Sequence, residues 1–124
     1  MTELTLTPLE HTWILDLDGT IVKHNGYKID GYDTFLDGAE EFLKSLPDGD
    51  MILFITSRTS EYKEQTEKFL TKHGVRYDYI IYNSPFGERI LINDSKPSGL
   101  KTAFAINTIR NGFDMINIVI DEKM

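Results

Sequence analysis

Residues 14–20 read Ile-Leu-Asp-Leu-Asp-Gly-Thr, and this stretch sets the fold and the chemistry that we expect. Its apolar part predicts a buried strand over residues 13–17. Side chains two residues apart in a strand share a face, so Asp16 and Asp18 can converge as the chain leaves the strand. Two carboxylates that close repel each other and need a counter-charge, usually Mg²⁺ with its oxygen ligands. Since a carboxylate can also attack phosphorus, the pair indicates metal-assisted phosphoryl transfer.

The string from Asp16 to Thr20, D-x-D-G-T, resembles the signature of the haloacid dehalogenase (HAD) superfamily, most of whose members are phosphohydrolases. In that family the first Asp attacks phosphorus and the second is the general acid and base. The resemblance therefore implies these roles for Asp16 and Asp18. It extends over residues 13–120 and is strongest to the small, capless HAD proteins found among capsule and lipopolysaccharide biosynthesis genes. An EF-hand loop counted from Asp16 is excluded, because its sixth and twelfth positions would be Ile and Tyr instead of Gly and Glu.

The length and composition indicate a single domain over residues 1–124. The chain has 13 basic and 20 acidic residues and a net charge of −7, which argues against a nucleic-acid groove built on bulk charge. A small phosphorylated ligand stays compatible with that charge. Without cysteine, neither a disulfide nor a zinc thiolate site can form. We expect no membrane span and no signal peptide, and therefore a cytoplasmic protein.

Apolar periodicity predicts strands and helices in alternation along the chain. The expected strands are residues 13–17, 51–55, 79–82, 89–93 and 115–120, and the expected helices are residues 35–46, 59–73 and 99–110. Alternation of this kind predicts an α/β fold, a Rossmann-like three-layer sandwich with a central, mostly parallel sheet. Residues 21–33 leave room for a flap and no cap domain. An open site of this kind suits a conjugated or macromolecular substrate, or closure by a second subunit in a homo-oligomer.

Ligands of parallel sheets bind beyond the carboxyl ends of the strands, and Thr56 follows the strand at residues 51–55. Its hydroxyl can donate to a phosphate oxygen. It also matches the second HAD motif, a Thr or Ser after an apolar strand. We therefore predict Thr56 as a catalytic and substrate-binding residue, with Ser57 and Arg58 as further substrate contacts. A helix cap and a surface arginine are the structural alternatives.

The third and fourth HAD motifs, a Lys and an acidic residue after later strands, have two placements. In the first, Asp94 completes a metal site with Asp16 and Asp18, and Lys96 supplies the catalytic cation. In the second, Lys96 is the third motif and Asp121 carries the fourth. We favour the first placement, because Asp121 has little chain after it to fix a metal ligand. Lys96 has a role in both.

We therefore expect a Mg²⁺-dependent phosphatase that acts through an aspartyl-phosphate on a phosphate monoester. Its partner would be a phosphorylated small molecule or conjugate, with sugar phosphates as the first candidates. A non-catalytic metal- or phosphate-binding domain is the alternative, since Ser84 stands where a Lys is expected and Asn93 where an Asp is common. A phosphotransferase using the same intermediate is a third interpretation.

Overall fold

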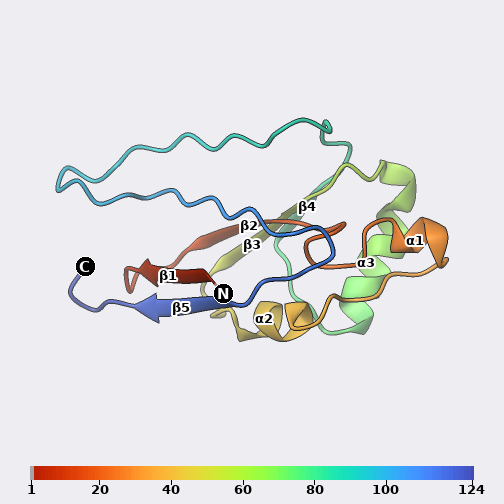
Figure 1. Cartoon of the computed structure of the whole chain (residues 1–124), viewed down its shortest axis with the longest axis horizontal. Helices are drawn as coiled ribbons and strands as arrows, with labels where there is room; N and C mark the ends of the chain where they lie inside the picture. Colours follow the sequence, from red (N-terminus) through yellow and green to blue (C-terminus); the bar gives the residue numbers. More distant parts are fainter. Residues whose placement is uncertain (1) are drawn as a thin grey trace.

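The computed structural model describes residues 2–124 and has an α/β fold in which the paired strands run parallel (Figure 1). Its strands are β1 (Thr2–Leu6), β2 (Thr12–Asp16), β3 (Met51–Ile55), β4 (Tyr79–Ile81) and β5 (Ile116–Ile120). Its helices are α1 (Gly26–Ile29), α2 (Ala39–Ser45), the 3-10 helix η1 (Ser60–Tyr62) and α3 (Lys63–Lys72). The predicted α/β class with parallel strands is therefore confirmed.

The strands form a three-stranded sheet in the order β2-β3-β4 and a separate two-stranded sheet of β1 and β5. In the larger sheet Thr12 lies opposite Met51, and Asp16 lies opposite Ile55. Because these two strands run parallel and in step, their carboxyl ends reach the same edge of the sheet. This edge carries both the D-x-D-G-T stretch and the turn that begins at Thr56.

One face of the three-stranded sheet packs against the helices. Along β3, Ile52 and Phe54 are buried, and they join a core cluster with Phe42 and Leu43 of α2 and with Leu70 of α3. This alternation is typical of a strand with one buried face. Within residues 2–124, no helix combines the length and the apolar character needed to cross a bilayer.

Two predicted elements are wrong: residues 89–93 form no strand and residues 99–110 form no helix. Most of both segments lies in a long excursion over residues 90–108 that leaves the body of the molecule (Figure 1). Ile92 is 90% exposed, so its side chain has no surface to pack against. A helix of about twelve residues is marginal in water without such packing, which explains why the periodic pattern alone does not form one.

The strand β1 (Thr2–Leu6) was not predicted, although polar and apolar residues alternate from Glu3 to Leu6. Its partner is β5, with Thr2 opposite Ile116 and Leu6 opposite Ile120. A pairing between segments so far apart in the chain leaves no local signal. The consequence for the site is large, because β5 lies beside β1 and not beside β2.

Asp50, just before β3, ties the beginnings of β2 and β3 together. Its Oδ1 accepts the His11 N–H at 3.1 Å, and its Oδ2 accepts from Trp13 Nε1 at 2.9 Å and lies 3.1 Å from His11 Nδ1. Burial alone would raise the pKa of Asp50, but the hydrogen bonds from Trp13 and His11 outweigh it and hold the pKa below its ordinary value.

Asp50→Asn should cost about 1–3 kcal/mol of unfolding free energy at pH 7, since the amide turns a donor toward the donors of His11 and Trp13. A carboxylate with a lowered pKa adds stability above its unfolded pKa, near pH 4, and that stability is lost as the pH falls through the folded pKa. The difference between wild type and variant should therefore shrink at pH 3 in urea unfolding. Asp48→Asn, at an exposed position in the same turn, should change neither value. An equal cost for Asp50→Asn at both pH values would contradict this role.

Candidate active site

The turn after β2 holds Thr20 against Asp16, the first of the two motif carboxylates. Gly19 adopts φ +82°, a left-handed conformation that glycine takes at little cost. The N–H groups of Thr20, Ile21 and Val22 all donate to the Leu17 carbonyl, at 3.2, 2.9 and 3.1 Å. This tight turn folds the chain back, so that the Thr20 hydroxyl donates to Asp16 Oδ2 at 2.9 Å.

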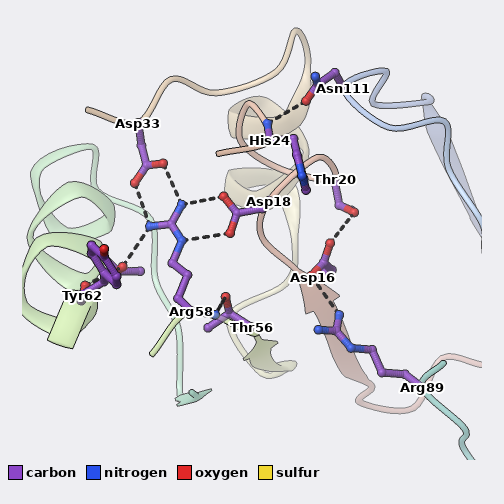
Figure 2. Close-up of polar contacts among 11 residues, drawn as sticks. Asp16, Asp18, Thr20, His24, Asp33, Thr56, Arg58, Tyr62, Arg89 and Asn111 are labelled. Atoms are coloured by element: carbon purple, nitrogen blue, oxygen red, sulfur yellow. Dashed lines mark hydrogen bonds and ion pairs between the residues drawn. The ribbon is translucent and has the colours of Figure 1, made fainter. Parts of the chain in front are cut away.

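The other carboxylate oxygen of Asp16 accepts from Arg89. The distance from Arg89 Nη1 to Asp16 Oδ1 is 2.8 Å, and the two side chains are 38% and 33% exposed (Figure 2). Sequence reasoning placed Lys96 as the cation here, but Lys96 lies in the exposed excursion, where its N–H donates to the Leu100 carbonyl. Arg89 stands in no recognisable motif, so no sequence signal pointed to it.

Asp18 is held by Arg58, which lies in the turn after β3. Nε of Arg58 donates to Asp18 Oδ2 at 3.0 Å, and Nη2 donates to Asp18 Oδ1 at 3.0 Å. Such a two-point pairing fixes the plane of the carboxylate as well as its distance (Figure 2). The predicted convergence of the two strand ends therefore joins Asp18 to Arg58 directly.

The neighbouring edge of the Arg58 guanidinium, formed by Nη1 and Nη2, is also occupied. Nη1 donates to Asp33 Oδ2 at 3.0 Å and to Thr66 Oγ1 at 2.9 Å, and Nη2 donates to Asp33 Oδ1 at 2.7 Å. Five contacts to acceptors match the five N–H donors of the group. Arg58 is only 3% exposed, and its carbon Cζ lies 4.0 Å from the centre of the Tyr27 ring. Arg58 therefore has no free donor for a substrate, which corrects its expected role as a substrate contact.

The charge state of Arg58 follows from these partners. Burial alone would lower the pKa of Arg58, but the hydrogen bonds to Asp33 and Asp18 outweigh it and raise the pKa above its ordinary value. Arg58 is therefore a permanent cation between two carboxylates. Sequence reasoning missed Asp33, because a buried carboxylate in a loop has no periodic signature.

Thr56 and Ser57 lie where predicted, but their contacts belong to the turn. Thr56 is 1% exposed, and its Oγ1 accepts the Arg58 N–H at 3.1 Å. Ser57 Oγ is 3.5 Å from the Pro85 carbonyl. Both contacts organise the turn that presents Arg58 to Asp18, and neither involves Asp16.

The expected metal set is not brought together. Within residues 2–124, no three Asp, Glu, His or Cys side chains are grouped so that they could hold a metal ion. Asp94 lies in the exposed excursion, because the strand that was to carry it does not form. Asp121 follows β5, and its N–H donates to the Leu6 carbonyl at 2.9 Å. Leu6 precedes the beginning of β2, so Asp121 lies at the opposite end of that strand from Asp16.

The remaining oxygen ligands fit Mg²⁺ only in part. Mg²⁺ commonly takes one or two carboxylates and completes its shell with water and substrate phosphate. The Asp16 carboxylate and the Asp18 backbone carbonyl are the groups that would serve. Both Asp16 oxygens already accept from Thr20 and Arg89, so a cation would compete with the Arg89 guanidinium.

Comparisons with known proteins give a structural similarity. No protein-family model matches the chain, and no curated protein matches it. A chain in the structure of the Pnkp1/Rnl/Hen1 RNA repair complex is 28% identical with a TM-score of 0.53, over 67% of this chain and 29% of that chain. A chain in a further structure of the Pnkp1/Rnl/Hen1 complex is 28% identical with a TM-score of 0.52, over 68% of this chain and 31% of that chain. The chain thus spans less than a third of the length of these similar chains, both of which come from complexes.

Proposed function

We propose that this chain is a phosphohydrolase of the HAD type that cleaves a phosphate monoester through an aspartyl-phosphate on Asp16. The observation that carries the proposal is the pairing across the sheet edge. The D-x-D-G-T turn after β2 and the Thr56–Arg58 turn after β3 meet there through the contacts between Asp18 and Arg58. Parallel α/β sheets bind their ligands at this edge, which supports a reaction centre here.

In the proposed reaction, a carboxylate oxygen of Asp16 attacks phosphorus, and the bond from phosphorus to the leaving oxygen breaks. Asp18, in its protonated form and with one oxygen released from Arg58, gives a proton to that oxygen, so that an alcohol departs. Water then attacks the phosphorus of the aspartyl-phosphate while the Asp18 carboxylate takes its proton, which releases phosphate and restores Asp16. Thr20 orients the nucleophile, and Arg89 offsets negative charge on the phosphate oxygens.

Mg²⁺, the substrate class and the location belong to the same proposal. When bound, the ion would offset charge on the phosphate oxygens, and Asp16 with the Asp18 carbonyl would hold it. A phosphorylated small molecule or conjugate in the cytoplasm is the proposed substrate, with sugar phosphates tested first. Because the chain is similar to part of an RNA repair complex, a phosphorylated RNA end should also be tested as substrate. A partner chain that closes the open site should be tested for the same reason.

The test is turnover of p-nitrophenyl phosphate, a sugar phosphate and an RNA oligonucleotide with a terminal phosphate. We expect phosphate release from at least one of them in Mg²⁺, its loss in EDTA, and its recovery when Mg²⁺ is restored in excess. Full activity in excess chelator would remove Mg²⁺ from the proposal. No release from any substrate in Mg²⁺ would contradict the phosphatase itself.

A non-catalytic phosphate-binding domain is the second candidate. It is favoured by the contacts of the motif carboxylates, since all four side-chain oxygens of Asp16 and Asp18 accept from Thr20, Arg89 or Arg58. Calorimetric binding of inorganic phosphate without turnover would select this candidate.

A further inference from the structure

Asp33 is a buried carboxylate that the proposed reaction does not use. It is 7% exposed, and its two oxygens accept from Nη1 and Nη2 of Arg58 at 3.0 and 2.7 Å. A buried charge is costly unless it is paired, so this pairing accounts for its stability there. It does not by itself account for the position of the pair beside Asp18 (Figure 2).

Arg58 links the two carboxylates through adjacent edges of one planar group, and its Nη2 donates to both of them. Asp33 accepts from Nη1 and Nη2 and Asp18 accepts from Nε and Nη2, while the Tyr27 ring covers the face. Because the guanidinium is flat and its donors have fixed directions, fixing one side determines where the other side points. The orientation of the Asp18 carboxylate therefore depends on Asp33.

Asp33 is in turn fixed relative to the motif turn. The chain on either side of the flap is tied by Lys23 N–H to the Thr34 carbonyl at 3.0 Å and by Leu36 N–H to the Ile21 carbonyl at 2.9 Å. Tyr27 belongs to α1 of the same flap. The flap thus returns to the site two groups, Asp33 and Tyr27, that both contact Arg58.

We propose that Asp33 is a positioning residue: through Arg58 it aims the Asp18 carboxyl at the leaving oxygen of the substrate. This inference rests on the proposed function and adds a specific consequence to it. Asp18 protonates the leaving oxygen, whereas attack by Asp16 does not require that proton. Loss of Asp33 should therefore harm substrates with strongly basic leaving oxygens and largely spare those whose leaving group departs without a proton.

The experiment compares Asp33→Asn with wild type on two substrates by kcat/KM, which reports the steps up to phosphorylation of the enzyme. On glycerol 2-phosphate, whose leaving alkoxide needs a proton, kcat/KM should fall about tenfold or more, as expected for a displaced general acid. On p-nitrophenyl phosphate it should stay within about threefold. Asp33→Glu is the second variant, because it keeps the negative charge. Its loss of kcat/KM on glycerol 2-phosphate should be smaller, and it provides the test if Asp33→Asn does not fold.

Asp30→Asn is the matched control. Asp30 lies in the same flap and pairs with Lys23 at 2.9 Å, without contact to Arg58. Its ratio of the two kcat/KM values should equal that of wild type. Equal losses on both substrates for the Asp33 variants, or no loss on either, would overturn the positioning role. If the positioning role is overturned but wild-type turnover still depends on Asp16, the proposed function stands. An inactive wild type would instead refute the proposed function itself.

Discussion

Asp16→Asn should lower turnover of a phosphate monoester by on the order of a thousandfold or more. The amide has the shape of the carboxylate but no anionic oxygen to attack phosphorus. Its carbonyl oxygen can still accept from the Thr20 hydroxyl, which donates to Asp16 at 2.9 Å in the wild type. We therefore expect the fold to survive, which thermal unfolding of the purified variant can check beside the assay of phosphate release.

The control for this prediction is Asp48→Asn. Asp48 is exposed in the turn before β3, at the end of the sheet away from the motif carboxylates. Turnover by the Asp48→Asn variant should stay within about twofold of wild type, as for other surface substitutions remote from a site. A folded Asp16→Asn variant that keeps a tenth of the wild-type turnover would refute the nucleophile assignment.

Arg58→Met should lower the free energy of unfolding by about 3–5 kcal/mol, as expected when one partner of a buried ion pair is removed. Methionine replaces much of the volume but none of the five donors. Asp33, whose side chain is 2% exposed, and Asp18, at 16%, would then lose their shared cation. Urea unfolding monitored by circular dichroism measures the loss.

Two further variants show whether the loss comes from unpaired charge. Arg76→Met removes an arginine that donates to the Asp50 and Pro47 carbonyls and is 36% exposed, and it should cost about 1 kcal/mol or less. Combining Arg58→Met with Asp18→Asn and Asp33→Asn should recover part of the stability, since the stranded carboxylates are gone. Similar losses for Arg58→Met and Arg76→Met would argue against a buried charge cluster.

The sequence predicted the elements whose packing is local and periodic. Met51–Ile55 forms a strand as expected, because its apolar run is bounded by turns and alternate residues reach the helices. The predicted helix at residues 59–73 appears as η1 and α3, and Gly74 ends it with φ +69°. Pairing of β1 with β5 could not be predicted, since it joins distant segments.

The residues of the candidate site also fall into those that local sequence patterns predict and those that only the tertiary structure places. Asp16, Asp18 and the turn at Thr56 were predictable, because they lie at or just after the carboxyl ends of two apolar strands that are parallel neighbours. Asp33 and Arg89 were not, because both lie in irregular chain and are placed only by the tertiary structure. The roles assigned to Asp94 and Lys96 have no structural support at the site, because the strand that was to carry Asp94 does not form and Lys96 lies with it in the exposed excursion.

The pairing of β1 with β5 has an entropic consequence for the whole chain. Thr2 and Ile116 are register partners, so this sheet closes a loop that contains nearly every other element. Closing a loop of that length costs about 4 kcal/mol of chain entropy. Five residues of backbone pairing on each strand do not easily offset such a cost. The side chains of Ile116 and Ile118, which pack against the main core, and of the buried Leu6 must supply much of the difference. Apolar burial therefore holds the two ends of the described chain together, while the site edge is organised by charge.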